Sequence, residues 1–419
     1  MHIPRRFAPE RTFLAFTVFT AVALSGCDRE ITTPMLDRGA PLARLETAPR
    51  YDITILPALG VSTRGTAINA AGSVAGFANL NDGSRHAALW LSGGVMDLGT
   101  LGGMNSSVQW PGINNTGWVV GIAETANADP LGEEWSCSAF FPAVTHHVCR
   151  GFVWRDGAMT ALPTFGGTHG FATEANERGQ VVGWAETPVH DPTCNAPQVL
   201  QFRAALWEPA NGSMRELRPL TGDSTSAATA INDRGQAAGI SGACDVAVGE
   251  FSAIHAVRWD AAGNPTELPT LGGEAWHTPM DINQGGDIVG FSNPPGVTGG
   301  VFDTHAALWP RQGGIVDLGV LPGDEFSEAL GINARAQIVG VSCGDVCHPV
   351  LWENGAIYDL NKLVAPGYAN ILLSARHIND VGQITGNILE TSSGRVLAFV
   401  ATPTAASLAQ PAGSSTAQK

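Results

Sequence analysis

Lysine is nearly absent from this chain of 419 residues, since Lys362 and Lys419 are the only two. Arginine supplies the other basic side chains, and 23 Lys and Arg residues against 38 Asp and Glu residues give a formal net charge of -15. Proteins that bind nucleic acids depend on basic side chains that contact the phosphates. The composition therefore argues against nucleic acid as a partner.

Long apolar runs and familiar cofactor signatures are missing as well. The apolar stretch at residues 13–24 is shorter than the roughly 20 residues that a helix needs to cross a bilayer. The chain contains no His-Glu-x-x-His sequence, no phosphate-binding loop and no dinucleotide fingerprint. No sequence motif thus indicates a metal or a cofactor, and we expect neither.

The N-terminus has the features of a secretory signal. Three arginines lie within the first 11 residues, the apolar stretch follows, and Leu24-Ser25-Gly26-Cys27 comes next. This arrangement resembles the lipobox of bacterial lipoproteins, in which the signal is removed before the cysteine and the cysteine is lipidated. The alternative is an ordinary signal peptide with an incidental cysteine.

The lipobox resemblance implies a signal peptide over residues 1–26, lipidation of Cys27, and an exported protein anchored to a membrane at the periplasmic side or the cell surface. Residues 27–50 are polar and without periodicity, which predicts a flexible tether. Residues 403–419 are rich in Ala, Ser, Thr and Pro, which predicts a disordered tail.

One pattern recurs seven times between the tether and the tail. It consists of Ile-Asn or Ala-Asn, a short turn that ends in Gly (Ala336 in one copy), and an apolar run that ends in a second Gly. An Asn side chain can cap its own turn and Gly supplies positive φ, so each copy predicts a β-hairpin. The seven asparagines, which we expect to be structural turn caps, are Asn69, Asn114, Asn176, Asn232, Asn283, Asn333 and Asn379.

Each hairpin, with strands A and B, is followed by a strand C that ends in Trp in six copies and by a strand D. Strand D follows C only six times, and the missing D stands before the first A, at residues 51–59. A chain that starts with D and ends with C can complete its last sheet with its first strand. The sequence therefore predicts an all-β fold, a seven-bladed β-propeller of four-stranded blades over residues 51–402, closed by the N-terminal strand 51–59. Other closed β-repeat folds are the alternative.

Strand C carries a recurring His-Ala pair, seen as His86-Ala87-Ala88, His255-Ala256-Val257 and His305-Ala306-Ala307. With the Asn-x-x-Gly hairpins and the Leu-Gly-Gly ends of strand D, these triplets resemble the bacterial HAF-repeat proteins, a family of extracellular repeats. The resemblance covers residues 51 to about 402. It implies an exported β-repeat fold and brings no established activity or catalytic residue.

Residues that recur in every blade are expected to be structural. The six tryptophans of strand C are predicted to pack between blades. Histidines recur at one position of strand C, and equivalent positions of a ring lie too far apart to share one ion. We therefore predict that His86, His255, His305 and His348 make structural hydrogen bonds.

The two ends of the blades differ in the length of their connections. The A–B and C–D turns are short, whereas the B–C connections vary and are long at residues 121–150 and 183–203. Binding sites are commonly built on long loops of a rigid scaffold, so we place the functional face on the side of the B–C and D–A connections. Residues that occur once near the D–A connections form the predicted ligand face: Arg64, Gln109, His169, Asp223, Glu274, Trp276, His277, Asp324, Glu325 and Tyr368.

Six cysteines besides Cys27 fall in the B–C connections: Cys137, Cys149, Cys194, Cys244, Cys343 and Cys347. An even number in an exported protein predicts disulfides. Ring geometry favours Cys137–Cys149 and Cys343–Cys347 within loops and Cys194–Cys244 between neighbouring blades, although six cysteines allow 15 pairings. A zinc site at Cys343, Cys347 and His348 is the alternative.

These features predict a binding or scaffolding module, anchored to the cell envelope, that presents a variable loop face to a glycan, a peptide or an envelope protein. We expect it to be a monomer. The alternative is a hydrolase or lyase of envelope glycans or peptides. Such an enzyme needs paired carboxylates, which Asp223, Glu274, Asp324 and Glu325 could supply at the mouth of the propeller.

Overall fold

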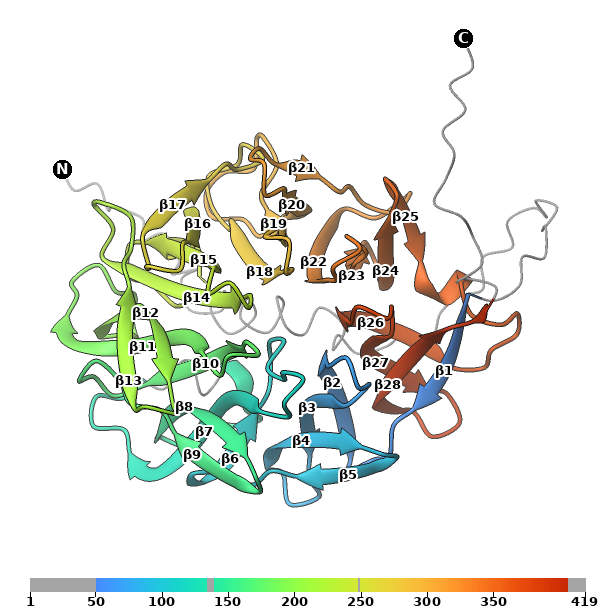
Figure 1. Cartoon of the computed structure of the whole chain (residues 1–419), viewed down its shortest axis with the longest axis horizontal. Coiled ribbons are helices and arrows are strands. Elements are labelled where there is room, and N and C mark those ends of the chain that lie inside the picture. Colours follow the sequence, from blue (N-terminus) through green and yellow to red (C-terminus); the bar gives the residue numbers. More distant parts are fainter. Residues whose placement is uncertain (1–49, 134–138, 248, 406–419) are drawn as a thin grey trace, which may run out of the picture.

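The computed structural model describes residues 50–133, 139–247 and 249–405. Over these residues, strands β1 to β28 form seven separate antiparallel sheets of four strands each, arranged around a common axis (Figure 1). The protein is a seven-bladed β-propeller, which confirms the fold that the repeats predict. Among the described residues, none of the helical segments has the length and apolar character of a membrane span.

The blades follow the repeats in chain order. Blade 1 contains β2 (Ser62–Ile68), β3 (Val74–Asn79), β4 (Arg85–Leu91) and β5 (Gly94–Asp97), and blade 2 contains β6 (Gly102–Ser107), β7 (Val119–Ala128), β8 (His147–Arg155) and β9 (Ala158–Ala161). Blade 3 contains β10 (Gly170–Ala175), β11 (Val181–His190), β12 (Leu200–Glu208) and β13 (Ser213–Leu217), and blade 4 contains β14 (Thr225–Ile231), β15 (Ala237–Gly242), β16 (His255–Trp259) and β17 (Pro265–Leu268). Blade 5 contains β18 (Thr278–Ile282), β19 (Ile288–Ser292), β20 (His305–Trp309) and β21 (Val316–Asp317), and blade 6 contains β22 (Phe326–Ile332), β23 (Ile338–Cys343), β24 (Cys347–Glu353) and β25 (Ala356–Asp359). Blade 7 contains β26 (Ile371–Ile378), β27 (Ile384–Glu390), β28 (Arg395–Pro403) and β1 (Tyr51–Ile55), and the 3-10 turn η1 (Leu360–Lys362) connects blades 6 and 7.

The N-terminal strand closes the ring. β1 pairs antiparallel with β28, from Tyr51 opposite Pro403 to Ile55 opposite Phe399, so the first strand is the outer strand of the last blade. Figure 1 shows the two ends of the colour scale side by side in this blade. The strand is shorter than the predicted 51–59, since pairing ends at Ile55 and Pro57 has no N–H to donate.

The seven asparagines cap their turns and also link the blades. In blade 4, Asn232 Oδ1 accepts the backbone N–H of Arg234 and of Gln236, and Asn232 Nδ2 donates to the carbonyl of Asn283 in the next blade, at 3.2 Å. The bond to the next blade recurs at all seven asparagines and ends with Asn379 donating to the Asn69 carbonyl at 2.8 Å. The predicted turn caps are confirmed, and together they form a closed circle of hydrogen bonds.

Backbone geometry explains the two small residues of the repeat. The turn residue has positive φ in every copy, including Ala336 at 57°, where six copies have Gly. The Gly that ends the apolar run of strand B faces a bulge of strand A. A Cβ on Gly239 would lie 2.1 Å from the Ala227 carbonyl oxygen, and the six counterparts are equally close to strand A. No side chain fits there, which accounts for this Gly in all seven copies.

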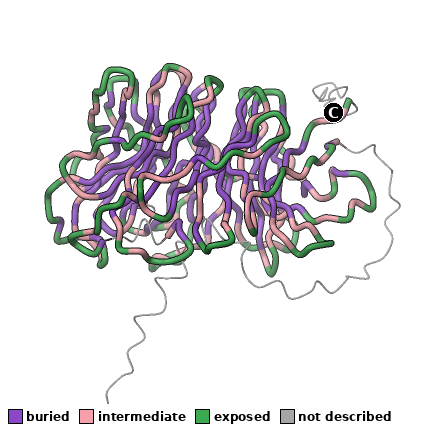
Figure 2. The backbone as a smooth tube through the Cα atoms, turned by 90° about the horizontal axis from the view of Figure 1, so that it is seen from below, coloured by how far each residue is buried: buried purple, intermediate pink, exposed green. Residues whose placement is uncertain are grey.

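The tryptophans and histidines of strand C have the structural roles predicted for them. The six tryptophans are at most 9% exposed, and Trp259 Nε1, for example, donates to the Arg218 carbonyl. Each of the four histidines contacts one aspartate, as His86 does Asp97 at 2.8 Å. The hydrogen bond to Asp97 raises the pKa of His86. The buried backbone lies between two exposed ends of the blades (Figure 2).

Candidate functional site

The propeller has two ends that differ in construction. We call the end with the A–B and C–D turns the turn face, and the end with the B–C and D–A connections the loop face. The circle of asparagines lies at the turn face, where the A–B turns are uniform. Long connections follow β7 and β11 on the loop face, between Ala128 and His147 and between His190 and Leu200.

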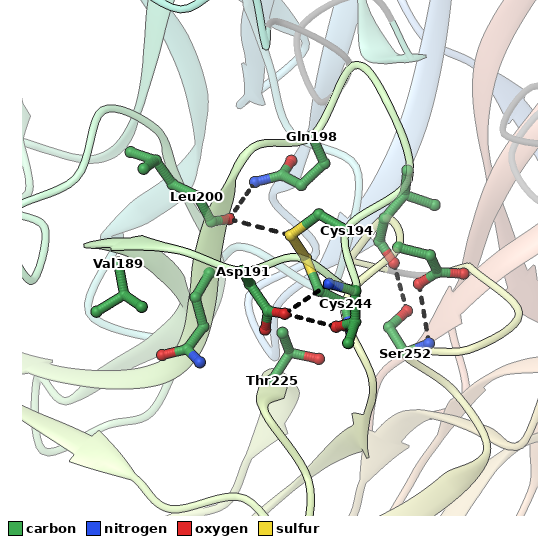
Figure 3. Close-up of a disulfide and its surroundings, with 12 residues drawn as sticks. Val189, Asp191, Cys194, Gln198, Leu200, Thr225, Cys244 and Ser252 are labelled. Carbon is green, nitrogen blue, oxygen red and sulfur yellow. Dashed lines mark hydrogen bonds between the residues drawn. A yellow bond between two sulfur atoms is a disulfide. The ribbon is translucent and has the colours of Figure 1, made fainter.

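A disulfide joins two neighbouring blades on the loop face. Cys194 and Cys244 link the β11–β12 connection of blade 3 to the β15–β16 connection of blade 4, as predicted (Figure 3). Asp191 accepts hydrogen bonds from Thr193, whose hydroxyl accepts the Cys244 N–H. The bond and its surroundings fix two connections to each other.

A second disulfide, Cys343–Cys347, spans the short connection between β23 and β24 and confirms another predicted pairing. Both sulfurs are therefore engaged, which argues against the alternative of a zinc site with His348. Cys149 is disulfide-bonded too. Cys137, its predicted partner, lies outside the described residues.

Apolar side chains fill the ring near the loop face. Phe140 of the long β7–β8 connection packs edge-on against Trp110 and Phe171 from the connections and inner strands of blades 2 and 3, with ring centroids 5.8 Å and 5.0 Å away. Met280 and Leu330 from blades 5 and 6 belong to the same cluster. The insertion in blade 2 thus packs against the inner strands of several blades.

The acidic residues of the predicted ligand face lie in separate blades. Asp223 accepts from the Ser241 hydroxyl and contacts His255 at 2.9 Å, and Asp324 contacts His348 at 3.2 Å. Both are bound to histidines of the blades that they precede. Glu274 accepts the Gly299 N–H, and Glu325 is exposed and donates its own N–H to the Cys343 carbonyl. The recorded contacts join none of these four carboxylates into a pair.

The predicted ring side chains are mostly buried. Trp276, at φ 60°, packs edge-on against Phe302 and donates Nε1–H to the Gly300 carbonyl. His277 contacts the Ser292 hydroxyl, and burial lowers its pKa to about 4. His169 is fully buried among acidic side chains.

The remaining predicted residues also have partners within the fold. Arg64 donates to the Thr63 carbonyl, Gln109 donates to the Ser107 hydroxyl, and Tyr368 packs against the core of blade 7. The ten predicted residues therefore do not meet in one pocket of the described structure. Whether any of them contacts a ligand stays a prediction.

Exposed large apolar side chains gather on the loop face. Of the 13 such residues in the described part of the chain, nine lie in or beside B–C and D–A connections, and every blade contributes at least one. The turn face has two, Leu91 and Val381, and the outer strands have Met96 and Val316. The nine are Val61, Met104, Leu131, Val144, Val189, Phe251, Val301, Val346 and Ile371.

A small cavity lies on the ring axis at the turn face. It has a volume of about 120 Å³ and is lined by residues of the seven A–B turns together with Glu174, Asp281 and His377. These three occupy the position two residues before the turn asparagine, which holds small residues in the other blades: Ala67, Gly112, Ala230 and Gly331. Sequence reasoning missed them, although their single occurrence at a repeat position was a usable signal.

The three ionisable groups of this cavity influence one another. Burial raises the pKa of Glu174 and of Asp281, and the charge of Asp281 raises that of Glu174 further. Burial lowers the pKa of His377, whose Nε2 lies 3.7 Å from Asp281 Oδ2. Such a group can bind a small cation or exchange a proton. Pockets for drug-sized ligands measure roughly 300–1,000 Å³, so this cavity is too small for a sugar chain or a peptide.

One serine has the spacing of a hydrolase nucleophile without the geometry. Residues Gly340–Gly344 read Gly-x-Ser-x-Gly, but Ser342 is fully buried within β23, whereas a nucleophile elbow is an exposed strand-to-helix turn. Its hydroxyl accepts the Leu321 N–H, as Ser241 and Ser292 accept the equivalent amides in blades 4 and 5. This serine is a repeated structural residue.

No protein-family description matches the chain, and no curated protein sequence matches it. Among solved structures, it is similar to virginiamycin B lyase from Staphylococcus aureus, with 12% identity and a TM-score of 0.46 over 85% of this chain and 99% of that chain. It is also similar to an oligogalacturonate lyase in complex with manganese, with 10% identity and a TM-score of 0.44 over 86% of this chain and 98% of that chain. At these identities the likeness concerns the fold alone.

Proposed function

We propose that this protein is an exported binding module that docks a protein or peptide partner on its loop face. The observation that carries the proposal is the distribution of exposed apolar side chains, nine on the loop face and two on the turn face. Soluble proteins rarely expose gathered apolar residues without an interaction to serve. The braced connections of blades 3 and 4 support it, because fixed loops lose less conformational freedom on binding.

The course of the chain supports a particular orientation. Pro403, at the end of β28, lies beside Gly382 of an A–B turn, and Tyr51 pairs with Pro403. Arg50 therefore leaves the ring at the turn face. A flexible tether from Cys27 to Arg50 has a root-mean-square length of roughly 25–30 Å. With lipid on Cys27, the turn face is nearer the membrane and the loop face is directed away from it.

A binding experiment on envelope material tests this function. The oxidised chain is incubated with an extract of envelope proteins, peptides and glycans, and the bound and free fractions are analysed by mass spectrometry. A triple variant, Val189→Ser, Phe251→Ser and Val301→Ser, removes three exposed apolar side chains of the loop face. Each loss costs on the order of 1 kcal/mol if that side chain is buried by the partner, so we expect retention to fall by about 100-fold or more.

The matched control changes the turn face by Val381→Ser, which removes a side chain of similar exposure. It should retain the partner like the unchanged protein. Equal retention by the triple variant, together with loss of the partner by Val381→Ser, would contradict the proposal. New product masses in the free fraction would instead favour the hydrolase or lyase, and Asp223, Glu274, Asp324 and Glu325 would be its first variants.

A further inference from the structure

A fully buried group of ionisable side chains lies between blades 2 and 3 on the loop face. Asp129 and Glu133 belong to the β7–β8 connection, His169 immediately precedes β10, and Glu186 lies in β11. All four side chains have no exposed surface. The group contains three carboxylates and one imidazole, which is an unusual concentration of charge for a protein interior.

Two of the carboxylates have donors. Glu186 accepts the backbone N–H groups of Thr168 and His169, the latter at 2.6 Å, and the side-chain amide of Gln198. Asp129 accepts the backbone N–H of Glu133 at 2.6 Å. These bonds fix the positions of both carboxylates.

The imidazole of His169 is oriented between two partners. Its Nδ1 accepts the Cys149 N–H at 3.1 Å, so in the neutral ring the proton is on Nε2. Nε2 lies 3.3 Å from Asp129 Oδ2, toward which it can donate. Because coordination at Nε2 needs a free lone pair there, this arrangement makes His169 a partner of Asp129 rather than a first choice as metal ligand.

Glu133 differs from the other three. Neither of its carboxylate oxygens has a hydrogen-bond donor at bonding geometry, although both are buried. Its ligand atom, with those of Glu186 and His169, lies within a set whose members are all within 4.8 Å of one another. Burial and the charge of Glu186 raise the pKa of Glu133. A buried carboxylate that faces a second carboxylate needs either a proton or a cation between them.

Charge balance favours the cation. Asp129, Glu133 and Glu186 carry three negative charges when ionised, and Arg150, whose charge acts on Glu186, supplies one positive charge. A divalent cation makes this group neutral. We propose that Glu133 and Glu186 bind a divalent cation that prefers carboxylate oxygens, such as Ca²⁺ or Mn²⁺.

The cation would join the long connection of blade 2 to the sheet of blade 3, since Glu133 belongs to the first and Glu186 to the second. It would brace the loop face in the same manner as the Cys194–Cys244 disulfide. The site does not depend on the proposed partner, because its test measures the metal alone.

The test is calorimetric titration of the metal-stripped, full-length oxidised chain with CaCl₂ and with MnCl₂, together with the electron paramagnetic resonance spectrum of Mn²⁺. We expect one cation per chain and a higher melting temperature with the metal. Glu133→Gln keeps the shape, breaks no recorded side-chain hydrogen bond and removes the charge. It should weaken binding at least about 10-fold and abolish the thermal shift.

The control is Glu124→Gln. Glu124 is the register equivalent of Glu186 in blade 2, and its oxygens accept from Met104, Asn105 and Thr145, so it has no free role in this site. Its substitution should leave cation binding unchanged. Absence of stoichiometric binding, or binding that Glu133→Gln does not alter, would overturn the proposal in favour of a proton shared by Glu133 and Glu186.

Discussion

Removal of one turn asparagine should destabilise the whole ring by a calculable amount. Asn232 is fully buried, accepts two backbone N–H groups and donates to the next blade. Asn232→Ala deletes three hydrogen bonds and leaves buried backbone groups without partners. At roughly 1 kcal/mol for each bond, we expect a loss of about 3 kcal/mol in the free energy of unfolding.

The assay is denaturant unfolding with thermal melting as a second probe. For roughly 350 ordered residues, an unfolding entropy of about 2.1 cal/mol/K per residue converts about 3 kcal/mol to a fall of about 4 °C in melting temperature. Asn264→Ala is the matched control, because Asn264 is an exposed turn asparagine whose side chain bonds only Asp260. Equal effects of the two substitutions would refute the structural role of the asparagine circle.

Three further predictions concern the closure, the interior and the loop face. Deletion of Tyr51–Ile55 removes the outer strand of blade 7 and should lower the melting temperature by more than the about 4 °C of one lost cap, whereas an unchanged value would contradict closure by β1. Burial raises the pKa of Glu328 to about 8 while Arg376 opposes it, so the native state holds the proton more tightly than the unfolded chain, and stability is lost as pH rises from about 4.5 to 8. Glu328→Gln removes this titration, so the melting temperature of the variant relative to the unchanged protein should rise between pH 5 and pH 8, and a constant difference would contradict the assignment. Replacement of Cys194 and Cys244 by alanine opens a crosslink over 50 residues and should cost about 2–4 kcal/mol in unfolding experiments, with no change if the bond does not form.

The fold could be predicted because the repeats carry their own backbone requirements. An Asn that caps a turn and a Gly that faces the carbonyl of strand A leave little choice at these positions, and both recur seven times. The position of one strand D before the first strand A was sufficient to predict that β1 completes blade 7. Strand lengths were less accurate, since the outer strands end earlier than their apolar residues suggest.

The sites were harder to predict, because they depend on contacts between blades. Phe140 gives no sign in the sequence that it packs against Trp110 and Phe171. Glu133 and Glu186 are 53 residues apart, and only the fold brings them together. The repeat alignment does carry a signal at Glu174, Asp281 and His377, where most blades have Ala or Gly.

The measurement that tests the account most directly is site-specific photo-crosslinking in the cell envelope. A photoreactive phenylalanine analogue replaces Phe251 on the loop face in one variant and Val381 on the turn face in another. If the loop face docks a protein partner, the variant at Phe251 forms a defined crosslinked product and the variant at Val381 does not. A product from Val381 with none from Phe251 would contradict the account.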